Sequence, residues 1–286
     1  MSIHVTALKQ ACDRLKEEKT ELGLTYRQIG KTDIFVCVEI HGHPQYFLAN
    51  QVPLNNSVLD LISEDKGFTY ELVKDVIRQP RTIAFIDPEP KERFQSYVQQ
   101  RSLEEMADTC EQAFAFPFVV KKNTGSQGEN VFLCHDRQEV LNAFTAIFNK
   151  HTPAYDHVAL VQERVDIDKE YRVTVLDQKI ELVYQKDNSQ AKFVGNLSPL
   201  HWDGARAVLV QDEAIWRQLD EFIRPMFAVF PLVYGGLDIA VDKNGKYWLF
   251  EANCRPAYDH LVAGSDLSVL VGLYEKILRL LAKKAV

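Results

Sequence analysis

Acidic and amide side chains are concentrated in one stretch of the sequence, Tyr234 to Pro256, which reads YGGLDIAVDKNGKYWLFEANCRP. Two strand-like runs flank an Asp-Lys-Asn-Gly segment at 242–245, and Asn-Gly between alternating apolar residues predicts a hairpin. Antiparallel pairing brings early residues of one strand beside late residues of the other, so we expect Asp238, Glu251 and Asn253 to converge. Two carboxylates and an amide oxygen suit Mg²⁺ bound together with phosphates. A surface hairpin with solvated acids is the alternative.

A second stretch with the composition of a phosphate site runs from Phe116 to Cys134, FPFVVKKNTGSQGENVFLC. Two apolar runs flank a polar loop that contains Gly125, Ser126 and Gly128. Backbone N–H groups of such a loop can approach phosphate oxygens closely. By alternation Lys121 points to one defined face, where its charge can reach a phosphate. No Walker A helix follows, so the pattern predicts a lid over phosphates like that of kinases. A mobile hairpin tip with surface lysines is the alternative.

Two further segments carry weaker signals. Glu163-Arg164-Val165 follows a strand-like run, and its main chain could bond adenine while Glu170 accepts bonds from a ribose; a solvated Glu–Arg pair is equally common. Lys66 is expected in the first turn of a helix. A cation is mildly disfavoured at that positive end, so Lys66 there is either solvated or marks a bound anion.

Composition excludes several classes of protein. The chain has 286 residues, room for two modest domains or one large one. Its net charge of −7 argues against a general nucleic-acid or membrane-surface binder. The five cysteines are scattered, which argues against a disulfide framework or zinc site. The N-terminal stretch lacks the apolar core of a signal peptide, and no run is long enough to span a membrane, so a cytoplasmic location is expected.

The elements that must position these residues alternate between helices and strand pairs. Helices are expected at 2–19, from Lys66 to 77, and at 102–113, 136–149, 213–230 (interrupted by Pro225) and 266–283. Further strands are expected at 33–40, 45–49, 82–86, 158–162, 170–176, 179–185 and 205–210. His41 and His43 lie between two strands and are interpreted as exposed turn residues rather than metal ligands. The polar stretch 186–204 has no predicted structure, and a loop of that length is usually functional or mobile.

The order of these features resembles the ATP-grasp superfamily of carboxylate–amine ligases. Relatives include D-alanine–D-alanine ligase, glutathione synthetase and the glutamate ligase that acts on a ribosomal protein. The resemblance covers roughly Ser63 to Pro256 and rests on FPFVVK, QERVD…KEYRV and GGLDIAVDKNGKYWLFEAN. It implies an α+β fold in which two α+β lobes clasp ATP. It also implies three parts: a reduced N-terminal substrate region (1–88), a small lid lobe (89–165) and a metal-binding lobe (166–286).

The resemblance also implies roles for individual residues. ATP would be bound by Lys66 and Lys121 at the phosphates, Gly125, Ser126 and Gly128 in the lid, Glu163 and Val165 at adenine, and Glu170 at the ribose. Asp238, Glu251 and Asn253 would hold one or two Mg²⁺ (or Mn²⁺) ions. The transferred phosphate and substrate carboxylates would meet Arg172, Lys186, Lys192, Asn196 and Arg255.

The sequence departs from the family pattern at three positions. Lys122 stands where the family usually has proline, Glu129 where a small residue is common, and Gly236 where some relatives have arginine. The region before Lys66 is also short, whereas relatives often carry a full α/β domain there. Nucleotide chemistry therefore carries over better than substrate choice.

The activity implied is an ATP-dependent ligation. A carboxylate attacks the γ-phosphate to give an acyl phosphate and ADP, and an amine then displaces phosphate to form an amide. The substrates would be small molecules, an amino acid or peptide among them, and a homodimer is possible because many relatives are dimers. A small-molecule kinase and an idle nucleotide-binding module are the alternatives. Cys254 is interpreted as a buried apolar residue rather than a nucleophile, and His201, Trp202, Tyr258 and His260 as either pocket or packing residues.

Overall fold

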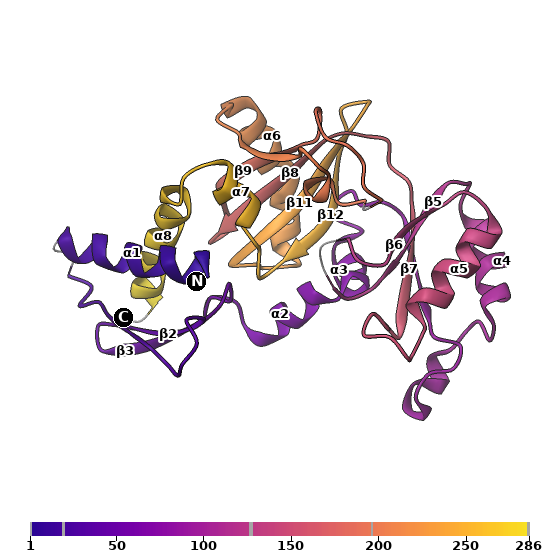
Figure 1. Ribbon diagram of the computed structural model, residues 1–286, viewed down its shortest axis with the longest axis horizontal. Helices are drawn as coiled ribbons and strands as arrows, with labels where there is room; N and C mark the ends of the chain where they lie inside the picture. Colours follow the sequence, from indigo (N-terminus) through magenta and orange to yellow (C-terminus); the bar gives the residue numbers. More distant parts are fainter. Residues whose placement is uncertain (1, 19–20, 126–127, 196, 285–286) are drawn as a thin grey trace.

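The computed structural model describes residues 2–18, 21–125, 128–195 and 197–284, and its elements form two lobes (Figure 1). The larger lobe holds a five-stranded and a three-stranded sheet, and the smaller lobe, at the right of Figure 1, holds a four-stranded sheet. Helices and antiparallel strands are mixed throughout, as the predicted α+β class requires.

The larger lobe is built around an antiparallel sheet with the strand order β10-β9-β8-β11-β12. Its strands are β8 (Ile167–Leu176), β9 (Lys179–Asp187), β10 (Arg206–Leu209), β11 (Tyr234–Asp242) and β12 (Tyr247–Asn253). β11 lies between β8 and β12 and is buried along nearly all its length, which is why it reads as an almost continuous apolar run. The predicted β11–β12 hairpin is confirmed, with Asp238 opposite Glu251 and Gly236 opposite Asn253.

Helices cover both faces of this sheet. One face packs against α7 (Asp259–Gly264), α8 (Ser268–Lys284) and α1 (Ile3–Glu17). The other packs against α3 (Lys66–Val73), α6 (Glu213–Ile223) and the 3₁₀ turn η3 (Arg224–Ala228). The predicted helix at 213–230 therefore ends as an α-helix at Ile223, because Pro225 cannot donate the next helical hydrogen bond. In β8, odd-numbered residues such as Tyr171 and Val173 join the second core, so Glu170 and Arg172 point to the opposite face.

The smaller lobe is a four-stranded sheet with two helices on it. The strand order is β4 (Thr82–Ile86), β7 (Val158–Glu163), β5 (Phe118–Lys122) and β6 (Val131–Cys134). The remaining elements are α4 (Leu103–Ala113), α5 (Arg137–Ile147) and the 3₁₀ turn η1 (Glu92–Tyr97). Ser102 caps α4, its Oγ accepting from the Glu105 N–H at 3.2 Å, and the Glu105 carboxylate accepts from the N–H of Arg101.

The N-terminal region packs onto the larger lobe. Its sheet is β1 (Thr25–Gln28), β2 (Phe35–Ile40) and β3 (His43–Leu48). The apolar face of α1, which includes Leu8 and Leu15, is buried against α8. The β2–β3 turn is shorter than predicted, because His41 and Gly42 both have positive φ and form a two-residue turn. β1, α7 and α2 (Ser57–Glu64) were not predicted. β4 is on the N-terminal side of the boundary expected at residue 88, yet it pairs with β7; the three-part division stays a prediction.

No helix in the described part of the chain is long and apolar enough to cross a bilayer. All five cysteines are free and buried.

Candidate active site

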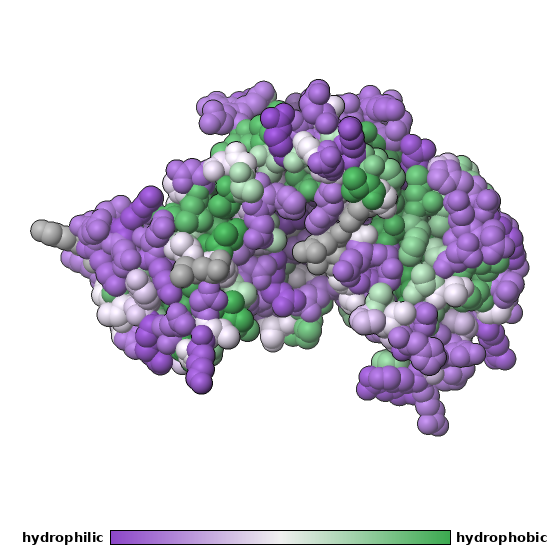
Figure 2. Space-filling view, viewed as in Figure 1, coloured by the Kyte–Doolittle hydropathy of each residue, from purple (hydrophilic) through white to green (hydrophobic). Residues whose placement is uncertain are grey.

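The predicted site residues meet in one cleft of about 610 Å³ between the two lobes. All of them that the structure describes, apart from Lys192, line this cleft, and polar side chains gather in the hollow between the lobes (Figure 2). They come from α3, from the β5–β6 lid, from the β7–β8 connection and from the central sheet. Ser126 and Asn196 lie outside the described residues. Lys192 does not line the cleft; its backbone pairs with Asp203 at the surface.

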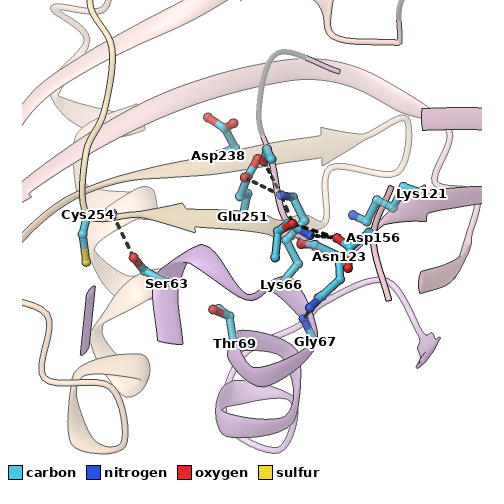
Figure 3. Close-up of polar contacts among 12 residues, drawn as sticks. Ser63, Lys66, Gly67, Thr69, Lys121, Asn123, Asp156, Asp238, Glu251 and Cys254 are labelled. Atoms are coloured by element: carbon cyan, nitrogen blue, oxygen red, sulfur yellow. Dashed lines mark hydrogen bonds and ion pairs between the residues drawn. The ribbon is translucent and has the colours of Figure 1, made fainter. Parts of the chain in front are cut away.

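The end of the β11–β12 hairpin forms the acidic floor of the cleft. Asp238 and Glu251 are opposite each other, and Asn253 follows on the same side of β12 as Glu251. Glu251 faces the cleft and its carboxylate lies 3.2 Å from Lys66 Nζ, at the start of α3 (Figure 3). The predicted convergence of these residues is therefore observed.

Asp238 belongs to a buried ionic cluster. Arg172 Nε lies 2.5 Å from its Oδ1, Arg172 Nη2 lies 3.1 Å from its Oδ2, and Lys186 Nζ lies 3.1 Å from that same Oδ2. Burial alone would raise the pKa of Asp238, but the two cations hold it below its ordinary value. Lys186 also bonds Glu170, whose pKa is raised by burial. Glu170 is thus held by a lysine rather than free in the cleft.

Arg172 lies in the space left by a glycine. A Cβ on Gly236 would sit 3.0 Å from Arg172 Cδ, 3.2 Å from its Nη1 and 2.8 Å from Pro256 Cβ. The guanidinium that binds Asp238 comes from the neighbouring strand β8, and Gly236 leaves room for it.

We expect Gly236→Ala to displace Arg172 from Asp238, because the rigid Pro256 ring leaves the added methyl no alternative space. Overpacking of this kind costs about 1 to 3 kcal/mol, measurable by urea denaturation. Gly272→Ala is the control: nothing lies within 4 Å of its Cβ position in α8, so stabilisation by about 0.5 to 1 kcal/mol is expected. Equal effects of the two substitutions would contradict this account of Gly236.

Lys121 is a buried cation at the roof of the cleft. It is 8% exposed, and its Nζ donates to Gln162 Oε1 at 3.0 Å. Burial lowers the pKa of Lys121 to about 8; Glu251 opposes this shift and Lys66 adds to it. The lysine lacks a described anionic partner within salt-bridge distance, so an anion entering the cleft would find its charge available.

The glycine-rich lid is anchored to the start of α3. Lys66 Nζ donates to the Gly125 carbonyl at 2.7 Å, and Asn123 Oδ1 accepts from the Gly67 N–H at 2.8 Å. Gly125 has a φ of +102°, and a Cβ there would lie 2.3 Å from Lys122 Cε. The two family departures at this loop form a pair, since Lys122 Nζ lies 3.1 Å from Glu129.

The side of the cleft proposed for adenine is apolar, with a backbone hinge. Val119, Val131, Leu133 and Ile167 line it together with the 163–165 segment. The Glu163 carboxylate accepts from the Arg81 N–H at 2.7 Å, so its side chain fixes the hinge while its main chain remains at the cleft. Val165 lies in the connection between β7 and β8, as predicted.

The remaining wall combines Arg255 with residues of the N-terminal region. Arg255 forms an ion pair with Glu64, and its carbonyl accepts from Asn50 Nδ2 at 2.8 Å. His201 and His260 line the cleft, whereas Tyr258 is fully buried and bonds Thr174. Burial raises the pKa of Cys254 to about 12, which agrees with its interpretation as a buried apolar residue.

Several residues that organise the site were missed from the sequence. Asp156 accepts from the Thr124 N–H at 2.6 Å and from its hydroxyl at 2.8 Å, which ties the lid to the start of β7. Asn123 accepts from the Gly67 N–H at the start of α3, and Gln162 accepts from Lys121. The position of Asn123-Thr124 directly before the glycines was the sequence signal that could have identified Asn123 as a site residue. No local pattern marks Asp156 or Gln162, because their partners are distant in sequence.

Comparison with known proteins supports this fold. A family model described as a RimK-like ATP-grasp domain matches residues 87–275. D-alanine–D-alanine ligase from Bacillus anthracis has a TM-score of 0.57 at 17% identity, over 81% of this chain and 72% of that one. A bifunctional glutathione synthetase from Pasteurella multocida has 0.54 at 13%, over 96% of this chain and 43% of that one. VanG D-Ala:D-Ser ligase from Enterococcus faecalis has 0.53 at 16%, over 77% and 64%. No curated protein matches the sequence. At these identities the structural similarities speak for the fold.

Proposed function

Since the chain belongs to the RimK-like ATP-grasp domain family, within the superfamily of carboxylate–amine ligases, we propose that it is an ATP-dependent ligase that joins a small-molecule carboxylate to an amine. The observation that carries this proposal is the meeting of Lys66, Lys121, Asp238 and Glu251, from separate segments, in one cleft under a glycine-rich lid. An amino acid or peptide is the substrate class we favour; a homodimer and a cytoplasmic location stay predictions.

The nucleotide would lie between the lid and the central sheet. Lys121 and Lys66 would meet its phosphates from the roof and from α3, while backbone N–H groups around Gly125 cover them. Lys66 would exchange the Gly125 carbonyl for a phosphate oxygen. Adenine would stack in the apolar part of the cleft and bond the main chain at 163–165. Glu170 would have to share its carboxylate between Lys186 and a ribose hydroxyl.

The acidic floor fits Mg²⁺ held partly by phosphates. In the described part of the chain no three acidic, histidine or cysteine side chains form a metal cluster. Glu251 and Asn253 offer oxygens to the cleft. Asp238 Oδ2 already contacts both Arg172 and Lys186, so only Oδ1, which accepts from Arg172 Nε alone, keeps a lone-pair direction for a metal ion. Mg²⁺ is preferably bound by few protein ligands, with phosphate oxygens completing its coordination shell. When bound, Mg²⁺ would neutralise charge on the phosphate oxygens.

The reaction then requires that the reacting groups are held in orientation and that water is excluded from them. Arg172 and Lys186, fixed by Asp238, would place fixed positive charge beside the transferred phosphoryl group, which needs no reorganisation during the reaction. The carboxylate would attack the γ-phosphorus and ADP would leave. The closed lid would keep water from the acyl phosphate until an amine attacks its carbonyl carbon.

An ADP-release screen tests this proposal. Purified protein is incubated with ATP and magnesium and each of the L- and D-amino acids, singly and in pairs. We expect ADP release that requires an acid and rises when an amine is added, with phosphate and amide as co-products. A stable phosphorylated product would indicate a kinase instead. ADP release that no acid or amine stimulates would contradict the proposal.

Nucleotide affinity is expected to depend on pH through Lys121. With a pKa of about 8, its ammonium is present below pH 8 and is lost as the pH rises above that value. Bound phosphates favour the charged form, so the Kd for ADP should rise above pH 8 by up to about tenfold per pH unit. Calorimetry between pH 7 and 10 measures this. Lys121→Met should bind more weakly and lose that dependence; an unchanged profile in the variant would contradict the role of Lys121.

A further inference from the structure

Three polar side chains at the substrate end of the cleft have no role in the proposed nucleotide site. His201 ends the 3₁₀ turn η2 (Pro199–His201), and Asp259 and His260 begin α7. All three line the cleft. The rings of His201 and His260 come from separate elements and meet edge to face, with centroids 5.4 Å apart and an interplanar angle of 89°. Elements distant in sequence therefore bring a carboxylate and two imidazoles to one wall.

Among the described residues, none of these three side chains forms a hydrogen bond or ion pair, in contrast to the paired cations of the cleft. Lys66, Arg172 and Arg255 are each paired with a carboxylate. Within the described residues the Asp259 side chain has no hydrogen bond or ion pair; it acts electrostatically on His4 of α1, whose pKa burial lowers to about 4. His4 is therefore uncharged at neutral pH and leaves the negative charge of Asp259 uncompensated. An exposed, unpaired carboxylate in a cleft attracts a cation.

His201 is suited to accept a proton. The groups that face it are His260 on α7 and Lys186 on β9, against which η2 packs. Burial, then His260, then Lys186 lower the pKa of His201 below its ordinary value of 6.5, so it is neutral at pH 7. Lys186 also contacts Asp238, so His201 lies beside the cluster that would hold the reacting phosphoryl group.

We propose that Asp259, His201 and His260 form the amine subsite of the ligase, for a substrate that enters as a primary ammonium ion. This rests on the proposed function. Asp259 binds the ammonium, His201 accepts its proton, and the edge-on ring of His260 positions His201. The other charged side chains near the floor are cationic or already paired, so this wall is the part of the described cleft that suits a cation.

The step balances as follows in atoms and charge. The ammonium gives one proton to a ring nitrogen of His201, and the neutral amine attacks the carbonyl carbon of the acyl phosphate. The bond between this carbon and the oxygen that links it to phosphorus breaks as the carbon–nitrogen bond forms. The departing phosphate takes the second proton from nitrogen, which leaves an amide, hydrogen phosphate and a protonated His201.

Comparison of two nucleophiles tests the subsite. Hydroxylamine is uncharged at neutral pH, so it needs neither Asp259 nor a base, and it traps the acyl phosphate as a hydroxamate. The second nucleophile is the amino-acid amine that the wild-type protein couples in the ADP-release screen. For His201→Gln we expect amide formation to fall about a hundredfold, the size of a general-base contribution, with the ratio of hydroxamate to amide rising accordingly. For Asp259→Asn we expect the KM of the amine to rise about tenfold, because a charge-assisted bond is lost.

The variants also give a signature that a structural role would not produce. Removing His260 removes one cause of the low pKa of His201, so in His260→Gln the acid limb of the amide-forming kcat should move to higher pH. His151→Gln, on the exposed turn after α5, is the matched control and should resemble wild type. Equal loss of hydroxamate and amide in His201→Gln, or loss of neither, would overturn the subsite. Wild-type protein that forms no hydroxamate with any acid would instead overturn the ligase function itself.

Discussion

Replacing Glu251 with glutamine is expected to reduce acid-dependent ADP release about a thousandfold, equivalent to about 4 kcal/mol of transition-state stabilisation. Glutamine keeps the shape of the side chain and removes its charge. Glu251 is the acid of the hairpin that faces the cleft, and its carboxylate lies 3.2 Å from Lys66 Nζ. Its loss removes an anionic ligand from the floor and also releases Lys66. Initial rates of ADP formation at saturating magnesium measure the effect.

Glu221→Gln is the matched control for this substitution. Glu221 is an exposed residue of α6, outside the cleft lining, so its rate should equal that of the wild type. An ADP-release rate for Glu251→Gln within a fewfold of wild type would show that the hairpin carboxylate has no part in the reaction, and the proposed metal-binding floor would be wrong.

Asp238→Ala is expected to lower the free energy of unfolding by about 3 to 5 kcal/mol, the usual cost of removing one partner from a buried ion pair. Asp238 and Lys186 have side chains only 9% and 5% exposed. Without the carboxylate, Arg172 and Lys186 remain as two buried cations close to each other, with Glu170 as their remaining acidic neighbour. Urea denaturation monitored by tryptophan fluorescence measures the change.

The surface pair Lys243–Asp166 provides the comparison. These two groups lie 2.9 Å apart with side chains 64% and 60% exposed, so Asp166→Ala should cost less than about 1 kcal/mol. Similar losses for the two aspartates would mean that the cluster around Asp238 is solvated rather than buried. Such a result would remove the reason for treating Arg172 and Lys186 as fixed charges.

Features set by short-range patterns could be predicted from the sequence. The β11–β12 hairpin follows from two strand-like runs on either side of an Asn-Gly turn, so the convergence of Asp238 and Glu251 was predictable. Their register also depends on the irregularity between Asp238 and Ile239, which was not predicted. Lys66 begins α3 as expected because Asp65 caps it, its Oδ1 accepting from the Phe68 N–H at 2.8 Å. The order of such signals identified the family, which the matching family model confirms.

Features that depend on distant partners could not be predicted in this way. Gly236 is an example: only the β8–β11 pairing shows that the space left by its missing side chain is filled by Arg172. The ribose role expected for Glu170 did not anticipate its bond to Lys186. β1 was missed because it is only four residues long and mostly exposed, which leaves little apolar alternation to detect.

The measurement that tests the central claim most directly is transfer of a heavy-oxygen label from the substrate carboxylate to phosphate. The acid that stimulates ADP release is labelled in both carboxylate oxygens and turned over with ATP and the amine, and the released phosphate is analysed by mass spectrometry. Activation as an acyl phosphate predicts one labelled oxygen in each phosphate. Phosphate without label, formed while ADP is released, would show that the carboxylate never receives the phosphoryl group and would contradict the proposed ligase.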